Sequence, residues 1–201
     1  YVEDGMLTLR VADAPEPLLP ASALPLLGRH NVDNALAAAL AARLAGADAE
    51  AIADGLRSAR PLPHRLEPVA EKDGVLWVND SKATNVAATR SALASLDRPV
   101  VILLGGKDKG EDFRPLGPAL HGRVRRAIAY GAAGPRIEAE LRGVVPVELM
   151  GSDFAAVVAR ASELARPGDL VLLAPACSSY DMFESYEHRG RTFAELAREV
   201  A

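Results

Sequence analysis

The sequence predicts an α/β fold in which a mostly parallel sheet carries helices on both faces. Over the last two thirds of the chain, short apolar segments rich in β-formers alternate with segments whose apolar residues recur at helical spacing. Polar or glycine-rich runs follow several of the apolar segments directly, where parallel strands end. Hydrophobic residues make up 49% of the 201 residues, which is enough for a sizeable core.

Residues 1–62 precede this alternation and are expected to form a separate region. A strand, a proline-rich connection and two helices are predicted there, at residues 6–11, 15–25, 31–45 and 48–58, respectively. The first of these helices is alanine-rich and is expected to begin at Asn31. The Pro61-Leu62-Pro63 run interrupts helical structure, so we predict a domain boundary between residues 1–62 and 63–201.

The second region contains the alternating strands and helices. Six strands are predicted, at residues 66–70, 75–78, 100–104, 127–130, 145–149 and 170–173. Five helices are predicted between and after them, at residues 86–96, 113–120, 136–141, 154–165 and 189–200. Asp73-Gly74 favours a tight turn, so the first two strands should form an antiparallel hairpin.

Composition argues against several classes of protein. The net charge of -4 does not suit a general nucleic-acid binder, and no apolar run approaches the length of about 18 residues needed to cross a bilayer. No charged and then apolar leader opens the chain. The single cysteine, Cys177, excludes an internal disulfide and a cysteine-based metal site. We therefore expect a soluble cytoplasmic protein in which Cys177 is a buried thiol rather than a nucleophile.

The densest polar run is Asp80-Ser81-Lys82-Ala83-Thr84-Asn85, which lies between the predicted strand 75–78 and the predicted helix 86–96. It combines a carboxylate, an ammonium group, hydroxyls and an amide within six residues. Loops of this kind lie at the carboxyl ends of strands, where ligands bind, and the next helix offers unpaired N–H groups to an anion. The alternative is a helix N-cap by Ser81 or Thr84 with solvated neighbours.

Glycines and lysines follow the predicted strand 100–104. Gly105-Gly106 allows a ligand to approach the backbone closely, and Lys107 and Lys109 add two ammonium groups, which suits an acidic substrate. The run is not a dinucleotide fingerprint, because the Gly-x-Gly-x-x-Gly spacing is missing. A solvated lysine pair remains the alternative.

Hydroxyl groups follow the predicted strand 170–173. Ser178, Ser179 and Tyr180 lie at this strand end, but nothing in the sequence places His188 beside either serine. A Ser-His-Asp triad is therefore not indicated.

Amide and imidazole groups occur upstream. Asn31 and Asn34 are three positions apart on one helical face and could present donors and acceptors to an adenine edge, although Asn31 could equally cap its helix. His30 and His64 are expected to form structural hydrogen bonds, and His121 is expected at the surface.

Several motifs, taken in order along the chain, resemble one known family. The motifs are Gly28-Arg29-His30-Asn31-Val32-Asp33-Asn34, Pro63-His64-Arg65, Asp80-Ser81-Lys82-Ala83-Thr84-Asn85, Leu103-Leu104-Gly105-Gly106-Lys107-Asp108-Lys109, Ala174-Pro175-Ala176-Cys177-Ser178-Ser179-Tyr180-Asp181-Met182-Phe183 and Glu187-His188-Arg189-Gly190. Over nearly the whole chain, their order and spacing resemble the Mur ligase family of peptidoglycan synthesis. Sister ligases that add other amino acids carry different residues at positions 81–84, so the resemblance is to the members that add D-glutamate.

The resemblance implies a role for each residue that matches the family's motifs. For binding of D-glutamate it implies Lys82, Thr84, Lys109, Ser179, Tyr180 and Tyr186, of which Lys82 and Lys109 would also be the catalytic cations. For binding of the nucleotide it implies Asn31 and Asn34 at the adenine end, Arg65 near the phosphates and Asp80 at the ribose. Tyr180 stands where relatives can have leucine, and Lys107 lies outside the motif, so the side-chain role of each stays open.

The reaction implied by the resemblance is carboxyl activation. ATP would phosphorylate the terminal carboxylate of UDP-N-acetylmuramoyl-L-alanine, and the amine of D-glutamate would attack the acyl phosphate. Such ligases need a Gly-x-x-x-x-Gly-Lys-Ser/Thr phosphate loop, which does not occur in these residues. We therefore expect the C-terminal part of a longer polypeptide, inactive by itself. Residues 1–62 would be a remnant of the central ATP-binding domain, and residues 63–201 the Rossmann-like C-terminal domain that binds the incoming amino acid.

The expected partners are small molecules: ATP, D-glutamate and the sugar nucleotide, the last held by the upstream domains. Mg²⁺ is implied with ligands upstream, so no metal ligand is assigned here, and we expect a monomer without a nucleic-acid or membrane partner. Two alternatives remain open. Another amino-acid-adding ligase, such as a folate polyglutamylating enzyme, should carry other residues at positions 81–84, and a stand-alone nucleotide-binding or scaffold domain would need no upstream partner.

Overall fold

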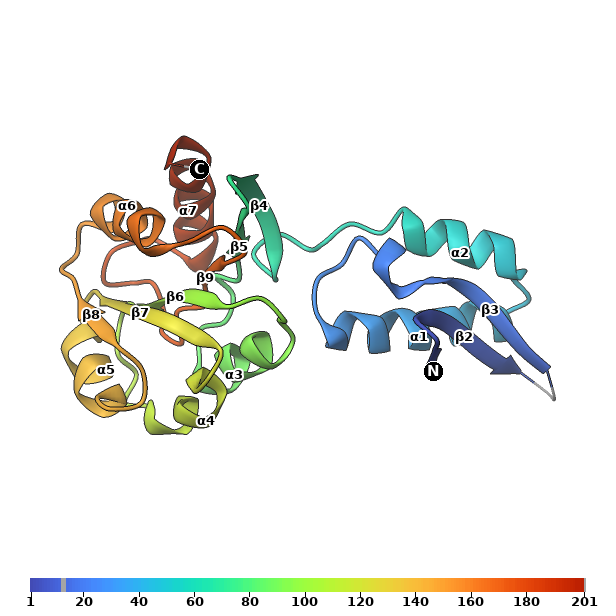
Figure 1. Cartoon of the computed structure of the whole chain (residues 1–201), viewed down its shortest axis with the longest axis horizontal. Coiled ribbons are helices and arrows are strands. Elements are labelled where there is room, and N and C mark those ends of the chain that lie inside the picture. The colour runs from blue at the N-terminus through green and yellow to red at the C-terminus, as the bar shows by residue number, and fades with distance from the viewer. Residues whose placement is uncertain (12–13, 201) are drawn as a thin grey trace. The chain divides into compact units, whose positions relative to one another are not determined.

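The chain forms two compact units, Tyr1–Pro61 and Leu62–Ala201, within a computed structural model that describes residues 1–11 and 14–200 (Figure 1). Prolines at 61 and 63 flank the boundary, and neither can continue a helix. Within the described residues, no helix is long and apolar enough to cross a membrane.

The first unit is an antiparallel sheet packed against two helices. Its strands are β1 (Val2–Glu3), β2 (Met6–Val11) and β3 (Ala14–Pro20), in that order across the sheet. A 3₁₀ turn (η1, Ala21–Ala23), α1 (Arg29–Leu44) and α2 (Ala49–Arg57) follow. The buried side chains of Leu7, Leu19 and Ile52 belong to the core of this unit.

Three details of the first unit differ from the sequence-based expectations. Residues 14–20 form strand β3 rather than a connection, and prolines are tolerated there because β3 is an edge strand that pairs with β2 alone. Helix α1 begins at Arg29, so Gly28 rather than Asn31 is its N-cap residue. Strand β1 is an additional element, which the Asp4-Gly5 turn joins to β2 with positive φ at both turn residues.

The second unit contains a six-stranded sheet in the order β4-β5-β9-β6-β7-β8. The strands are β4 (Glu67–Lys72), β5 (Val75–Asn79), β6 (Val100–Gly105), β7 (Val124–Tyr130), β8 (Val147–Leu149) and β9 (Leu170–Leu173). The predicted Asp73-Gly74 turn makes β4 antiparallel to β5, and the other pairings are parallel. Every residue of β6 and β9 is buried, as expected for strands covered on both faces.

Helices cover both faces of this sheet, which confirms the predicted fold class (Figure 1). Helices α6 (Phe154–Leu164) and α7 (Tyr186–Val200) lie on one face, where α6 contacts β6 and β7 while α7 contacts β4 and β5. Trp77, Leu103 and Phe193 are buried in the core on this side. Hydrophobic burial therefore fixes α7 over β4 and over β5, the strand that leads to the polar Asp80–Asn85 run.

The opposite face carries α3 (Val86–Ala94), α4 (Gly117–Leu120) and α5 (Gly134–Leu141). The helix predicted at residues 113–120 is instead a 3₁₀ turn (η2, Arg114–Leu116) followed by the short α4. Pro115 and Pro118 cannot donate main-chain hydrogen bonds, so a longer helix is not stable there.

Gly105 ends β6 at a point where the backbone of β7 passes very close. Its φ is +151°, and a Cβ at this position would collide with the carbonyl oxygen of Tyr130. Gly110, five residues later, also has a positive φ of +80°, but a Cβ there would meet nothing within 4 Å. Of these two glycines, Gly105 alone combines unfavourable backbone geometry with a close neighbour.

We expect Gly105→Ala to lower the free energy of unfolding by about 3 kcal/mol, because the new methyl group adds overpacking to backbone strain. Gly110→Ala is the control and should cost only about 1 kcal/mol, since it adds strain alone. Urea unfolding followed by fluorescence of Trp77, the single tryptophan, measures both values in the second unit. Equal losses for the two variants would contradict the close approach at Gly105.

Candidate functional site

Three loops meet at the carboxyl ends of neighbouring parallel strands. We call them the β5 loop (residues 80–85), the β6 loop (residues 106–113) and the β9 loop (residues 174–185), each after the strand that it follows. Main-chain hydrogen bonds join the loops to one another and to the strand ends. They run from the N–H groups of Asp80, Ala176 and Lys107 to the carbonyl oxygens of Leu173, Ala83 and Ser178, over 2.8, 2.9 and 2.8 Å, respectively. The structure thus brings the three polar runs together at one edge of the sheet.

The β5 loop leads directly into α3. The N-cap of α3 is Asn85, whose side chain accepts a hydrogen bond from a main-chain N–H of the first turn over 2.8 Å, so neither Ser81 nor Thr84 is the cap. The Ser81 hydroxyl instead donates to the carbonyl oxygen of Tyr186 over 2.8 Å. Lys82 is exposed, and its ammonium group lies 5.3 Å from the centre of the Tyr186 ring. Lys82 and Tyr186, which the sequence analysis names as candidates for binding D-glutamate, are therefore neighbours.

A buried arginine joins the β5 loop to the β9 loop. Arg189 on α7 is fully buried. Its Nε and Nη2 groups donate to the hydroxyl and carbonyl oxygens of Ser81, each over 2.9 Å, and its Nη1 group donates to the carbonyl oxygen of Cys177 over 3.1 Å. A Cβ at Gly106 would collide with the carbonyl oxygen of Ser178 and approach Nη1 of Arg189 to 3.1 Å, which explains why the β6 loop has no side chain there.

The segment before β4 has strained backbone beside the candidate Arg65. His64 and Leu66 have φ angles of +63° and +41°, which are unfavourable for residues with side chains. The main-chain N–H of Leu66 donates to Oδ1 of Asp80 over 3.2 Å, and Nδ1 of His64 lies 3.0 Å from Nδ2 of Asn79. His64 thus forms a structural hydrogen bond, as predicted. Backbone strain of this kind is typical of functional sites.

Asp80 is a buried carboxyl group at the end of β5, with 8% of its surface exposed. Burial raises its pKa from 3.8 to about 6, and the hydrogen bond from Leu66 and the charge of Arg65 only partly oppose this shift. Asp80 is therefore ionised at neutral pH but takes up a proton more readily than an ordinary aspartate.

The β6 loop presents Lys109 beside the start of α3. The Lys109 ammonium group lies 3.7 Å from Oε1 of Glu111, and Oε2 of Glu111 accepts a hydrogen bond from the N–H of Val86 over 2.9 Å. Val86 is the first residue of α3 and follows the β5 loop directly. One carboxylate thus connects Lys109 to the loop that contains Lys82 and Thr84.

The two candidate hydroxyl groups of the β9 loop differ in burial. Ser179 is 2% exposed, whereas the Tyr180 side chain is largely in solvent. Cys177 is a buried free thiol, as predicted, and burial raises its pKa to about 12. The thiol is therefore protonated at neutral pH and unreactive as a nucleophile.

The amide pair of the sequence analysis lies in the first unit, on α1. Nδ2 of Asn31 donates to the carbonyl oxygen of Leu27 over 2.7 Å, and Nδ2 of Asn34 lies 3.4 Å from Oδ1 of Asn31. The two amides are thus on one face of the helix. The side chain of Asn34 is exposed.

Several residues that position the site were not among the sequence-based candidates. They are Asn79, Glu111, Arg136 and Arg189. Asn79 is the buried last residue of β5 and directly follows the apolar run Val75-Leu76-Trp77-Val78. An amide at the end of such a run needs hydrogen-bond partners when it is buried, so this signal was available in the sequence. The contacts of the other three depend on residues distant in the chain. Among residues 1–11 and 14–200, no group of three or more His, Cys, Asp or Glu side chains could hold a metal ion.

Asp80→Asn changes the free energy of unfolding of the second unit, and we expect this change to be more stabilising at pH 7.5 than at pH 4.5. The difference between the two pH values should be about 2 kcal/mol. A carboxyl group whose native pKa is raised stabilises the fold fully below its unfolded pKa of about 3.8, and this contribution is lost as the pH rises through about 6. Asparagine carries no charge and can still accept the Leu66 hydrogen bond, so it avoids this loss. Urea unfolding at both pH values measures the difference.

Asp97→Asn, which removes an exposed carboxylate, controls for the change in net charge. An effect of Asp80→Asn that is the same at both pH values would show that Asp80 is solvated in the native state.

Comparison with known protein sequences identifies close relatives. The sequence profile described as "Mur ligase, glutamate ligase domain" matches residues 64–177. The UDP-N-acetylmuramoylalanine–D-glutamate ligase of Acidobacterium capsulatum is 50% identical over 199 residues, which are 98% of this chain and 43% of that protein. The ligase of the same name from Salinibacter ruber is 46% identical over 193 residues, which are 96% of this chain and 42% of that protein. The chain thus spans about two fifths of the length of these curated relatives.

Comparison with solved structures supports the fold. MurF from Acinetobacter baumannii aligns with a TM-score of 0.64 at 20% identity, over 96% of this chain and 42% of that one. The bifunctional folylpolyglutamate synthase/dihydrofolate synthase of Yersinia pestis, complexed with AMPPNP and a Mn ion, aligns with a TM-score of 0.62 at 22% identity, over 93% of this chain and 43% of that one. Since the family profile covers more than half of the residues, the chain belongs to the Mur ligase family.

Proposed function

We propose that these residues are the C-terminal part of an ATP-dependent ligase that adds D-glutamate to UDP-N-acetylmuramoyl-L-alanine in peptidoglycan synthesis. The observation that most directly supports this function is the β5 loop. Its Asp-Ser-Lys-Ala-Thr-Asn run lies beside two further ligand-type loops at the carboxyl end of a parallel sheet and carries an exposed lysine. Membership of the Mur ligase family and the names of relatives 46–50% identical to the chain agree with it.

D-glutamate would bind between the three loops. Six residues form the proposed subsite: Lys82, Thr84, Lys109, Ser179, Tyr180 and Tyr186. The substrate has two carboxylates and needs cations or N–H donors for each. The exposed ammonium groups of Lys82 and Lys109 supply charge, and the Ser179 hydroxyl with nearby main-chain N–H groups would bind the second carboxylate. Tyr180 would contribute its main chain, since its ring is in solvent.

Each unit contains residues that we propose for nucleotide binding. In this proposal residues 1–62 belong to the central ATP-binding domain and residues 63–201 to the amino-acid-binding domain. Asn31 and Asn34 offer amides to the adenine ring, the exposed Arg65 suits a phosphate, and the Asp80 carboxylate suits ribose hydroxyls. Mg²⁺ would be held by residues outside this chain.

The reaction would proceed through an acyl phosphate. The γ-phosphoryl group of ATP is transferred to the terminal carboxylate of UDP-N-acetylmuramoyl-L-alanine, and the amine of D-glutamate then attacks the acyl carbon. The amide bond forms and inorganic phosphate leaves. Residues 62–201 would orient the amine and exclude water, while Lys82 and Lys109 would neutralise charge as the phosphoryl and acyl groups move.

The setting of this activity follows from its substrates. ATP and the sugar nucleotide are small molecules of the cytoplasm, so we propose that the enzyme works there. We also propose that it is a monomer. Its partners would be its substrates, without a nucleic acid or a membrane.

Phosphate release by the full-length polypeptide tests the proposal. ATP, Mg²⁺ and UDP-N-acetylmuramoyl-L-alanine are supplied with D-glutamate in one reaction and with L-glutamate or other amino acids in the others. We expect release that depends on D-glutamate. Phosphate release with a different amino acid would overturn the interpretation of the β5 loop. The absence of phosphate release in every reaction would favour a nucleotide-binding or scaffold domain.

We expect Lys109→Ala in the full-length polypeptide to raise the D-glutamate concentration needed for half-maximal activity about 10- to 100-fold, because one charge-assisted hydrogen bond is lost. Thr84→Val should raise it less, about 3- to 10-fold, since only a neutral hydroxyl is removed. Nucleotide affinity should change little in either variant. Titrations of each substrate measure both effects.

Lys72→Ala is the matched control, because Lys72 ends β4 beside the Asp73-Gly74 turn, at the other end of β5 from the β5 loop. An unaltered D-glutamate requirement in Lys109→Ala would remove Lys109 from the site.

A further inference from the structure

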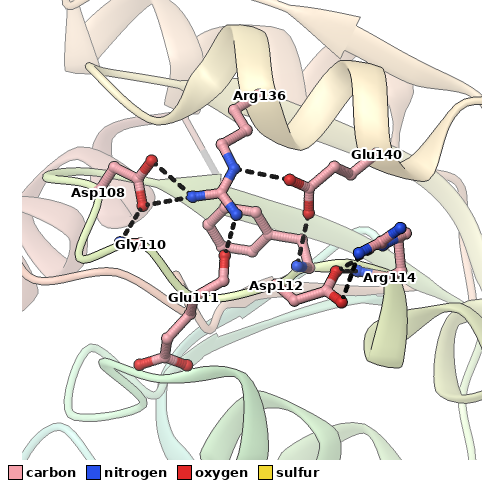
Figure 2. A network of polar contacts seen from close by, with 8 residues as sticks. Asp108, Gly110, Glu111, Asp112, Arg114, Arg136 and Glu140 are labelled. Atoms are coloured by element: carbon pink, nitrogen blue, oxygen red, sulfur yellow. Dashed lines mark hydrogen bonds and ion pairs between the residues drawn. The ribbon is translucent and has the colours of Figure 1, made fainter.

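The β6 loop is fixed by a helix that contributes none of the proposed substrate-binding residues. Arg136 and Glu140 are four positions apart on α5, so both project from one helical face toward the loop (Figure 2). Nε of Arg136 donates to Oε1 of Glu140 over 2.6 Å. The pair therefore presents a pre-oriented guanidinium group and a carboxylate side by side.

The guanidinium group of Arg136 binds the loop on both sides of Lys109. Its Nη1 group contacts both carboxylate oxygens of Asp108, at 2.9 and 3.2 Å, and its Nη2 group donates to the carbonyl oxygen of Glu111 over 2.6 Å (Figure 2). The Asp108 carboxylate also accepts the N–H of Gly110 over 2.7 Å. The main chain before and after Lys109 is thus tied to one side chain of α5.

The far end of the loop is fixed by the same pair. Oε2 of Glu140 accepts the N–H of Phe113 over 2.7 Å, and the guanidinium carbon of Arg136 lies 5.4 Å from the centre of the Phe113 ring. Phe113 is buried, so this end is also held by packing. The carboxylate of Glu111, within the loop, accepts a hydrogen bond from the N–H of the first residue of α3.

We propose that Arg136 is a positioning residue for binding of the acidic amino acid: it fixes the β6 loop so that the Lys109 ammonium group is held beside the β5 loop. This inference rests on the proposed function, because it assigns to Lys109 a carboxylate of the substrate. The Lys109 side chain itself is well exposed, and within residues 1–11 and 14–200 its ion pair is the long contact of 3.7 Å with Glu111. Its position therefore depends on the main chain from which it extends, and that main chain is held by Arg136.

A second arginine offers a matched comparison. Arg160 on α6 binds Glu148 through two nitrogens, at 2.8 and 3.1 Å, and Glu163 over 2.6 Å. Its side chain is 36% exposed, as is that of Arg136. Arg160 joins α6 to β8 and belongs to none of the three loops. Replacing either arginine removes a similar set of ion pairs and hydrogen bonds. Of the two, Arg136 alone holds a loop that we propose to bind substrate, the β6 loop.

The test uses the full-length polypeptide with Arg136→Lys and Arg160→Lys. Lysine keeps the positive charge but cannot bond to Asp108, Glu140 and the Glu111 carbonyl at once. We expect Arg136→Lys to raise KM for D-glutamate about 10-fold, with kcat and KM for ATP within about twofold, because a loosened loop must be ordered when the substrate binds. Arg160→Lys should leave all three constants unchanged.

A double-mutant cycle shows whether Arg136 acts through Lys109. In a Lys109→Ala background, Arg136→Lys should raise KM for D-glutamate by less than about twofold, since the group that it positions is gone. Asp108→Asn breaks the same clamp from the loop side and should reproduce the KM increase. It keeps the inference testable if Arg136→Lys lowers the melting temperature so far that the protein does not fold.

Three results would overturn the inference. They are an unchanged KM in Arg136→Lys, equal effects of the two arginine variants, and full additivity with Lys109→Ala. Failure of the proposed function is distinguishable, because the wild-type polypeptide would then show no phosphate release that depends on D-glutamate.

Discussion

The candidate site depends on the fully buried guanidinium group of Arg189. It donates to two oxygens of Ser81 and to the carbonyl oxygen of Cys177, so it joins the β5 and β9 loops to α7. Removing it would leave these oxygens buried without a donor, and unpaired buried polar groups are costly. Hydrogen bonds to a buried side chain therefore hold these loops in one arrangement, in addition to the packing of buried loop residues such as Ala83 and Cys177.

Two arginines from opposite faces of the sheet hold the three loops in place. Arg189 extends from α7 on one face and holds the β5 and β9 loops, whereas Arg136 extends from α5 on the other face and holds the β6 loop (Figures 1 and 2). The lysines proposed to bind substrate, Lys82 and Lys109, are in contrast exposed. Cations that hold the scaffold are thus separated from cations available to a ligand, which allows loops to be ordered before a substrate arrives.

Much of the fold was predictable because the periodicity of apolar residues reports burial. Strand β6 is apolar throughout since both of its faces are covered, and the Asp73-Gly74 turn forms the predicted hairpin. The errors came from local rules applied without their tertiary context. Prolines predicted a connection at residues 15–25, yet β3 tolerates them at a sheet edge. The Asp4-Gly5 turn carried the same signal as Asp73-Gly74, and β1 could have been found from it.

The sequence by itself determined the type and order of most elements, the position of the polar runs at strand ends and the resemblance to the Mur ligase family. These properties depend on short stretches of chain, so they can be recognised without coordinates. The tertiary structure alone decided which residues hold the runs together. Arg189 and Ser81 are 108 positions apart and Arg136 and Asp108 are 28 apart, and the folding of the sheet brings each pair into contact. A hydrogen bond between such distant residues leaves no periodic pattern in the chain, because its geometry exists only once the strands have paired.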